Sequence, residues 1–545
     1  MNANNQKPLK DQQLSRSDLA DAEFDAIVVG AGHNGLAAAV HLASKGWRVA
    51  VVEAADIPGG AVKTLPLTEP GFRHDWAAMN LSMFAGSNFH AAYAGELSAH
   101  GLEFVPAPNC FASVFRDGTS LGVSTDLALT GDRISQLSAA DAEAWRRMLT
   151  GFGSDAPHIF AILGSPLPSF AAVKAAWKAY RAIGMDGLWR LGKLLLATPR
   201  GFLDAHFEDD KLKAMMAAWG LHLDFAPDVA GGALFPYLES MANQAFGMVV
   251  GKGGADTIIR AMVGLLEQKG GQVLLGQRVN EIRLDSRGRA KGVILQNGRV
   301  LSARRAVIAN LNPKILFGDL LPPSTIPENV RSAVRGYRAG PGTMMIHLSM
   351  DELPDWQAGA DLKTFAYVHI APDLAMMSKV YSEAMDGLLP AEPALVVGQP
   401  TAIDPSRAPD GKHVLWVQVR VLPAEIKGDA SGQISGLDWN VVKEAYADRV
   451  IDLLARYAPG VRKLIRNRVV YSPADLEREN PNLIGGDNLA GSHHLDQNFL
   501  FRPIVGYSRY KTPIRSLYMC GASTWPGAGT GAGSGFMLAK MLAGK

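Results

Sequence analysis

A glycine-rich turn between a predicted strand and a predicted helix constrains the fold of this chain more than any other feature. Residues 25–29 are a short apolar run of the kind that forms a buried parallel strand. Residues 30–35 then carry the pattern G-x-G-x-x-G, and an alanine-rich helix is predicted from Leu36 to about Lys45. A second strand, 47–52, ends beside Glu53. Strand, glycines, helix, strand and acid in this order predict a dinucleotide-binding β-α-β unit.

Each part of this unit has a physical task. Gly30 permits the tight turn, Gly32 lets the backbone approach a pyrophosphate, and Gly35 lets helix and strand pack closely. The helix N-terminus offers N–H groups and a partial positive charge to the phosphates. An acid about 20 residues further on accepts hydrogen bonds from a ribose and disfavours a 2′-phosphate. The predicted contacts of this unit are Gly30, Gly32, His33, Asn34, Gly35, Glu53 and Ala54.

A second glycine turn follows the acid almost at once. Gly59 and Gly60 precede Ala61, and Lys63 lies two residues further on. In this the chain resembles FAD enzymes of the glutathione-reductase and amine-oxidase superfamily, in which this loop passes the pyrophosphate towards the flavin ring. Many relatives carry arginine after the paired glycines, where this chain has Ala61. The resemblance therefore implies FAD as the cofactor, with Gly59, Gly60 and Ala61 near it.

Two later segments are predicted to return to the same domain. Residues 251–310 show a helix, a set of strands and an Asn-Gly turn, and the resemblance places Val279 against the adenine. Residues 516–545 show a strand, a glycine-rich loop and a last helix. A glycine-rich loop at a helix N-terminus suits the N1–C2=O edge of the flavin, which becomes negative on reduction. The residues predicted to contact the cofactor here are Gly521, Ala522, Gly529, Thr530 and Gly531.

At 545 residues the chain is too long for one ordinary core. We predict an α/β fold, in which a Rossmann-type FAD-binding domain carries an inserted α+β substrate domain. The predicted ranges are a flexible leader (1–22), a discontinuous FAD-binding domain (23–105, 245–310 and 485–545) and a substrate or cap domain (106–244 and 311–484). Strand-like runs at 343–350, 364–370, 394–397 and 413–421 predict an antiparallel sheet in the cap.

Composition excludes several kinds of function. The formal charge of +2 gives no reason to expect nucleic acid as a partner. With only Cys110 and Cys520, neither a disulphide framework nor a paired-cysteine metal site is expected, so we predict no metal. The first 22 residues lack a secretory apolar core, and a spanning helix is not expected, because no run of about 18 apolar residues exists. These features favour a cytoplasmic protein whose membrane contact, if any, is peripheral.

Taken together, the sequence resembles the phytoene-desaturase-like flavoproteins. The residues that carry the resemblance are 25–35, 53–60, 71–75, 485–487, 495–497, 501–503 and 517–521. The last pieces are most similar to the animal branch named for a pyridine nucleotide-disulphide oxidoreductase domain. Relatives usually have His-Pro-Gly where this chain has Trp525-Pro526-Gly527, so a histidine beside the flavin is replaced. The resemblance implies a flavin-dependent oxidoreductase.

Candidates for acid–base chemistry lie in the segment that re-enters the flavin domain: His493, His494, Asp496, Gln497 and Arg502. Of these, His494, Gln497 and Arg502 are the predicted catalytic residues. The competing interpretation is that adjacent histidines form hydrogen-bonded scaffolding and that Arg502 braces a loop. Asp75, Trp76 and Asn80 either line a cavity or belong to the core.

Three functions remain open from the sequence. The first is desaturation, saturation or isomerisation of C–C bonds in an apolar, polyene-like or lipid-like substrate. The second is an FAD-dependent amine or alcohol oxidase that uses O2, and the third is a flavin-binding partner protein with little turnover. A basic amphipathic stretch, 173–200, either lies on an anionic membrane or is an ordinary helical cap with a solvated basic face.

Overall fold

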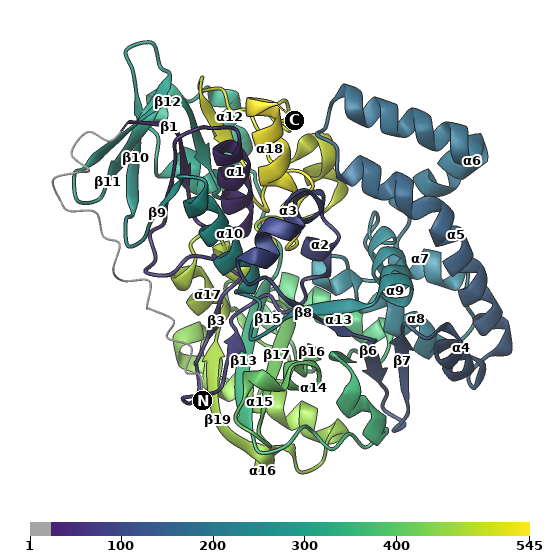
Figure 1. Ribbon diagram of the computed structural model, residues 1–545. Coiled ribbons are helices and arrows are strands. Elements are labelled where there is room, and N and C mark those ends of the chain that lie inside the picture. Colours follow the sequence, from purple (N-terminus) through teal and green to yellow (C-terminus); the bar gives the residue numbers. More distant parts are fainter. Residues whose placement is uncertain (1–22, 545) are drawn as a thin grey trace.

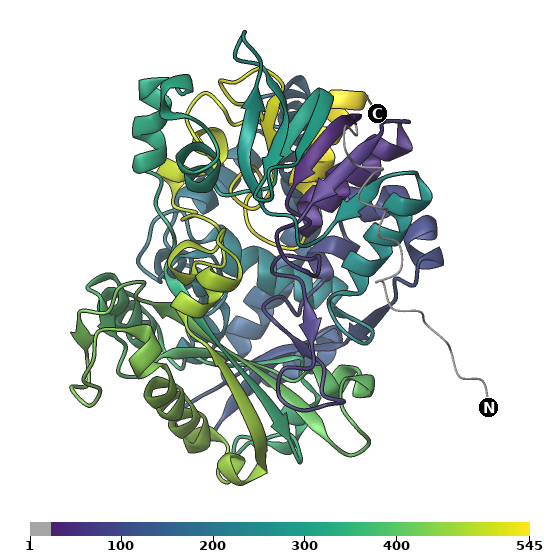
Figure 2. The ribbon, with the colours of Figure 1, turned by 90° about the vertical axis from the view of Figure 1, so that its left-hand side faces the viewer.

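The computed structural model describes residues 23–544, which build two large sheets with helices around and between them (Figures 1 and 2). The first sheet has the order β10-β11-β12-β1-β2-β9, and β20 pairs with β12. Its parallel strands are β1 (Glu23–Val29), β2 (Val49–Val52), β9 (Gln272–Leu274), β12 (Val300–Ala309) and β20 (Leu517–Met519). The antiparallel meander is β10 (Val279–Leu284) and β11 (Ala290–Leu295).

Side chains of β1 alternate between the two faces of this sheet, as the pleat requires. Ala26 and Val28 pack on the face covered by α1 (His33–Ser44), α10 (Thr257–Gln268) and α18 (Gly533–Ala543). Ile27 and Val29 pack on the opposite face with α11 (Pro313–Gly318) and α12 (Glu328–Arg335). Both of these last helices lie beyond residue 310, so the sheet takes part of its cover from the range assigned to the cap.

The second sheet has the order β19-β13-β17-β16-β14-β6-β7 and fills the lower half of Figure 2. Its strands are β6 (Asn109–Val114), β7 (Ser120–Ser124), β13 (Gly342–Met350), β14 (Tyr367–Ile370), β16 (Ala394–Gly398), β17 (His413–Leu422) and β19 (Ile465–Tyr471). The sheet is not wholly antiparallel as predicted, because β6, from the first insertion, pairs in parallel with β14. The two insertions therefore share one sheet, whose outer face is covered by α15 (Trp439–Tyr457).

Helices between β7 and β8 form a lobe at one side of the molecule (Figure 1). They are α4 (Leu127–Ser135), α5 (Ala139–Leu163), α6 (Phe170–Leu196), α7 (Pro199–Asp204), α8 (Asp210–Ala217) and α9 (Leu234–Phe246). The long helix α6 is broken at Gly184, whose φ of 68° is left-handed and which has no side chain to obstruct the turn. Within residues 23–544, none of the helices combines the length and apolar character needed to cross a membrane.

Shorter elements connect these layers. The helices are α2 (Ser82–Ala85), α3 (Asn88–Ala99), α13 (Leu374–Met385), α14 (Pro400–Ile403), α16 (Val461–Leu464) and α17 (Pro473–Glu479). The strands are β3 (Thr64–Leu65), β4 (His74–Asp75), β5 (Phe104–Ala107), β8 (Met248–Gly251), β15 (Leu388–Leu389) and β18 (Gly428–Asp429). The predicted α/β fold class is confirmed; the leader predicted at 1–22 lies outside the described residues, and the domain ranges stay a prediction.

Candidate functional site: a dinucleotide cavity between the two sheets

The first glycine turn is built as the spacing predicts. Gly30 has a φ of +96°, and its N–H donates to the Val52 carbonyl at 2.8 Å, which joins the turn to the end of β2. A Cβ on Gly35 would lie 2.3 Å from the carbonyl oxygen of Gly30, so helix α1 approaches the turn as closely as only glycine allows. Helix α1 begins at His33 instead of the predicted Leu36, because Leu36 N–H already donates to the Gly32 carbonyl at 3.0 Å.

The N-terminus of α1 opens towards the second glycine turn. Its N-cap is Gly32, which supplies no side-chain cap, so the first N–H groups of the helix are left for a ligand. Gly32 and Gly59 form a parallel bridge, and Gly59 N–H donates to the Ala31 carbonyl at 3.0 Å. The first turn, assigned to the pyrophosphate by its motif, and the second, assigned to it by the family resemblance, therefore lie side by side.

Glu53 and Lys63 place opposite charges beside these turns. The Glu53 carboxylate accepts from Ala31 N–H at 2.7 Å and from Ala55 N–H at 3.0 Å, which holds it at the end of β2. Lys63 is buried, with its Nζ 5.5 Å from the centre of the Trp76 ring. Burial lowers the pKa of Lys63, and the charges of Glu53 and Glu479 oppose that shift. Lys63 is thus a buried basic side chain in this loop, two residues after Ala61.

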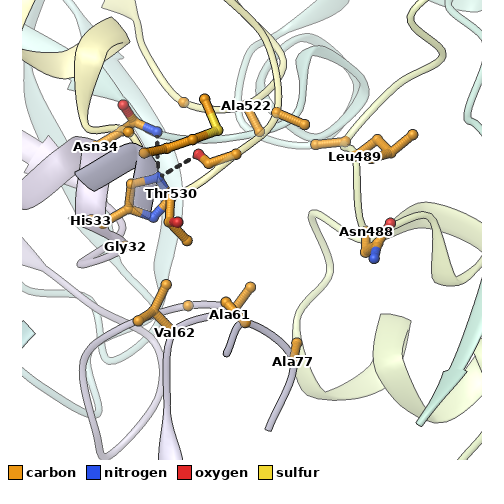
Figure 3. Close-up of a pocket in the computed structure, with 18 of the residues that line it drawn as sticks. Gly32, His33, Asn34, Ala61, Val62, Ala77, Asn488, Leu489, Ala522 and Thr530 are labelled. Atoms are coloured by element: carbon orange, nitrogen blue, oxygen red, sulfur yellow. Dashed lines mark hydrogen bonds between the residues drawn. The ribbon is translucent and has the colours of Figure 1, made fainter. Parts of the chain in front are cut away.

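The C-terminal loop closes the site from the other side. A ring nitrogen of His33 lies 3.1 Å from the Gly529 carbonyl, and the Thr530 hydroxyl donates to the Asn80 carbonyl at 3.1 Å. A Cβ on Gly535 would lie 1.8 Å from the Asn34 carbonyl oxygen, so α18 rests directly on α1. Figure 3 shows Gly32, His33, Ala61, Ala522 and Thr530 around one open space, with Asn488 and Leu489 across it.

These parts enclose a single continuous cavity of about 1190 Å³. Every predicted cofactor residue except Gly35 lines it: Gly30, Gly32, His33, Asn34, Glu53, Ala54, Gly59, Gly60, Ala61, Val279, Gly521, Ala522, Gly529, Thr530 and Gly531. Gly35 serves the packing of α1 against the turn, as described above. The uncapped helix, the buried cation and the glycines fit the diphosphate of a flavin dinucleotide.

Beyond the glycine loops the cavity continues between α9 and the second sheet. There it is lined by apolar and aromatic side chains, among them Trp219, Leu234, Phe235, Leu238, Tyr367 and Trp416. Met83, Phe160 and Phe246 line the cavity and are also 51%, 45% and 69% exposed, which marks an apolar mouth. An apolar mouth and wall are suited to a ligand that has little polar surface.

The predicted catalytic residues hold loops together and do not line this cavity. The His494 ring donates through Nε2 to the Asp224 carbonyl at 2.9 Å, away from the cavity wall. The Gln497 side chain forms two hydrogen bonds with the backbone of Arg338: it accepts from the N–H and donates to the carbonyl, each at 2.8 Å. The structure places these two side chains in the loop scaffold.

Arg502 is likewise fully buried and lies outside the cavity lining. It donates to the carbonyls of Ser492 at 2.9 Å and Ala522 at 2.8 Å. Because Ala522 belongs to the glycine-rich loop, Arg502 is a positioning residue for the cofactor site.

Three polar residues that line the cavity are candidates for contact with a ligand: His493, Glu239 and Asn80. His493 lines it, and its Nε2 accepts from Ala528 N–H at 3.0 Å, so the neutral ring carries its proton on Nδ1. Glu239 of α9 lines it too, and burial raises the pKa of its carboxyl to about 7. Asn80 also lines the cavity, whereas Asp75 and Trp76 belong to the buried interior. The one sequence signal for Glu239 is an acid that directly follows the apolar and aromatic stretch 233–238.

A Rossmann-type sheet whose two glycine turns, ribose acid and C-terminal loop line one cavity defines a flavin-dinucleotide oxidoreductase. The chain matches the flavin-containing amine oxidoreductase family over residues 35–532, and it belongs to that family. It is an FAD-dependent enzyme, and the predicted resemblance to phytoene-desaturase-like flavoproteins is confirmed.

Two curated relatives illustrate the range of the family. The chain is 28% identical to the mouse pyridine nucleotide-disulfide oxidoreductase domain-containing protein 2, in a match that covers 93% of this chain and 91% of the relative. It is 26% identical to a phytoene desaturase of Fusarium fujikuroi, covering 94% and 87%.

Among solved structures, cyclohexylamine oxidase from Brevibacterium oxydans matches with a TM-score of 0.55 at 17% identity and covers 95% of this chain and 98% of its own. A putrescine oxidase variant matches with a TM-score of 0.60 at 16% identity, covering 96% and 98%. At such low identity these structures establish the shared fold alone.

Proposed function

We propose that this FAD-dependent enzyme acts on C–C bonds of an apolar, polyene-like or lipid-like substrate, by desaturation, saturation or isomerisation. The observation that carries the proposal is the continuity of the cavity, which runs from the glycine turns to an apolar, aromatic chamber and an apolar mouth. Relatives named as a phytoene desaturase and as part of a limonene dehydrogenase support it, since both names refer to hydrocarbons.

In this proposal the chain's own residues bind, orient and exclude water. The N–H groups at the start of α1, the Lys63 ammonium and the Glu53 carboxylate hold the dinucleotide. Bound FAD supplies the acceptor for a hydride from a substrate carbon. Leu234, Phe235 and Leu238 of α9 place the apolar substrate in a chamber that water does not fill readily.

Desaturation also releases a proton, which must leave the substrate within the chamber. Glu239 is suited to accept it, because burial raises the pKa of its carboxyl to about 7 and it lines the cavity. We propose Glu239 for this task in place of His494 and Gln497, whose hydrogen bonds are used within the loops.

One observation favours the second candidate, an FAD-dependent amine oxidase that uses O2. The same Glu239 carboxylate, when ionised, would pair with a substrate ammonium, and a solved structure of the same fold is putrescine oxidase bound to putrescine. Most of the chamber wall is apolar or aromatic, and its polar members include the cation Arg420, which would repel an ammonium; we therefore place this candidate second.

Anaerobic titration of the purified holoenzyme separates the two. Phytoene and limonene serve as hydrocarbon probes, and cyclohexylamine and putrescine serve as amine probes. We expect a hydrocarbon to bleach the visible flavin absorbance while the amines leave it unchanged. Bleaching by the amines alone, with peroxide formed on adding air, would overturn the proposal in favour of the oxidase. A flavin that no probe reduces would exclude desaturation of these probes, and failure to convert any hydrocarbon with either oxidised or reduced flavin would revive the idea of a binding partner with little turnover.

We also propose that the protein is cytoplasmic and contacts membranes peripherally through 173–200. Helix α6 carries Trp177 and Trp189, which are 59% and 71% exposed, beside several basic side chains. Two of those basic groups are engaged within the protein, since Arg190 pairs with Asp155 and Arg200 with Asp228. Lys174, Lys178, Arg181 and Lys193 remain for anionic headgroups.

A further inference from the structure

Arg420 is a buried arginine that forms no ion pair with a carboxylate within residues 23–544. It lies on β17, is 8% exposed and lines the cavity. Its Nη2 donates to His222 Nδ1 at 3.0 Å and its Nη1 donates to Asn488 Oδ1 at 3.3 Å, whereas its Nε has no partner within residues 23–544. Both partners are neutral groups, so the guanidinium keeps its charge and several of its five N–H groups uncompensated.

Two fully buried arginines, Arg407 and Arg502, show how this protein otherwise pairs the charge and the N–H groups of a buried guanidinium. Arg407 faces two carboxylates, those of Asp75 at 2.7 Å and Asp404 at 3.1 Å. Arg502 donates to the backbone carbonyls of several loop residues. Of these three arginines, Arg420 alone lies on the wall of the cavity, and its missing counter-ion is therefore expected to come from the cavity.

The side chains around Arg420 also carry buried hydrogen-bond donors that have no acceptor within residues 23–544. His222 accepts through Nδ1, so its proton is on Nε2, and that atom is buried without a partner in the described chain. The indole Nε1 atoms of Trp219 and Trp416 are buried and unpaired in the same way within residues 23–544. The Trp219 and His222 rings lie 4.7 Å apart, and all three side chains line the cavity.

Within residues 23–544, no carboxylate forms an ion pair with Arg420; Glu239 lines the same cavity, but its charge is not among the causes that shift the pKa of Arg420. Asp487 is the acid whose charge affects the pKa of Arg420, but its oxygens already accept from the N–H groups of Gly340, Leu489 and Gly491 at 2.7–2.8 Å. A buried guanidinium with free N–H groups and further unpaired donors beside it has the composition of an anion site.

We infer that Arg420 binds the carboxylate of an otherwise apolar substrate. The planar guanidinium matches a carboxylate with two parallel hydrogen bonds, and His222 Nε2–H adds a third donor. The apolar side chains of Leu223 and Leu238 line the same cavity and receive the hydrocarbon part. This inference rests on the proposed function, because it names the head group of the same substrate: an unsaturated or saturated carboxylic acid of the lipid or terpenoid type.

Equilibrium binding to the holoenzyme tests this without turnover. Decanoate and decan-1-ol have the same chain and differ in the head group, and calorimetric titration gives the Kd of each. We expect wild type to bind decanoate at least about tenfold more tightly than the alcohol. In Arg420→Gln that preference is lost and in Arg420→Lys it is partly retained, whereas Arg287→Gln, an exposed arginine of the β10–β11 hairpin, leaves it unchanged.

Equal affinity of wild type for the acid and the alcohol overturns the inference, and this comparison needs no variant to fold. Loss of FAD from Arg420→Gln with equal binding of both probes in wild type would assign Arg420 to the cofactor instead. The proposed function fails separately, since reduction of the flavin by a hydrocarbon does not depend on the decanoate preference. A decanoate preference, with no flavin reduction by the hydrocarbons or by decanoate itself, would sustain the carboxylate site and count against the C–C chemistry.

Discussion

The carboxylate of Asp75 and the guanidinium of Arg407, 332 residues apart in the chain, form a buried ion pair of 2.7 Å. Asp75 Oδ1 also accepts from the Thr64 hydroxyl and from Ala255 N–H, and Arg407 Nη2 donates to the Gly251 carbonyl at 2.9 Å. One pair thus joins β4 and its partner β3, the loop between β8 and α10, and the segment that follows α14.

Replacing Arg407 with methionine is expected to destabilise the holoenzyme by about 3–5 kcal/mol, because the carboxylates of Asp75 and Asp404 are left buried and unpaired. The free energy of unfolding by denaturant measures this. Arg116→Met is the matched control: it breaks an exposed ion pair with Asp373 and should cost less than about 1 kcal/mol. Equal losses in both variants would contradict the joining role of Arg407.

Gly35→Ala is expected to release FAD. The added Cβ would lie 2.3 Å from the Gly30 carbonyl, so α1 must move away from the turn that holds the diphosphate, at a cost of about 1–3 kcal/mol. FAD per chain after gel filtration, read from the visible spectrum, measures the effect. Gly95→Ala on α3 is the control, since a Cβ there meets no atom within 4 Å. Full FAD content in Gly35→Ala would show that α1 tolerates the shift.

The cofactor half of the site was predictable because its signals are local. A tight turn, a close approach and an uncapped helix each need particular residues within a short stretch of chain, so Gly30, Gly32 and Glu53 were recognisable from spacing alone. The substrate half depends on contacts between distant segments. Arg420 and Glu239 stand on β17 and α9, and only the tertiary fold brings them to one cavity. No spacing rule connects such positions.

The placement of His494 and Gln497 outside the cavity lining has a physical origin, and their catalytic role stays a prediction. Polar residues in a loop that re-enters a domain are equally suited to catalysis and to holding the loop's own backbone. The structure uses Gln497 for the backbone of Arg338 and His494 for the carbonyl of Asp224. The adjacent His493 is the one that lines the cavity. A shift of one residue along a loop turns a side chain to a different surface, and sequence does not define that direction.

The stability of the protein should depend on pH through Glu239. Its folded pKa of about 7 lies above the ordinary 4.5, so the folded state keeps a proton that the unfolded state has released. This stabilisation is complete below about pH 4.5 and is lost as pH rises towards 7. Glu239→Gln should remove the loss, on the order of 1–3 kcal/mol.

The difference between wild type and Glu239→Gln isolates this group. Burial lowers the pKa of His222 and His493, which makes stability rise with pH in both proteins alike. Denaturant unfolding at pH 5 and pH 8 is therefore compared between the two. A difference that does not change with pH would mean that Glu239 titrates normally, and would weaken its proposed role as proton acceptor.

Helix α6 provides the last test, that of membrane contact. Trp177 and Trp189 are 59% and 71% exposed, and burying two such rings at a lipid interface contributes a few kcal/mol. Trp177→Ser combined with Trp189→Ser should lower binding to vesicles of phosphatidylserine and phosphatidylcholine by about tenfold or more, measured by co-sedimentation. Val441→Ser is the control, because Val441 is 71% exposed but lies on α15, far from this helix in sequence.

Varying the salt concentration separates the electrostatic part of vesicle binding from the part contributed by the tryptophans. The basic side chains Lys174, Lys178 and Arg181 attract anionic headgroups, so vesicle binding should weaken as ionic strength rises. Neutral vesicles lack that attraction but still accept the tryptophans, so the double variant should reduce binding to them as well. If the wild-type protein binds neither anionic nor neutral vesicles, the proposed membrane contact is wrong and α6 is only a cap of the helical lobe.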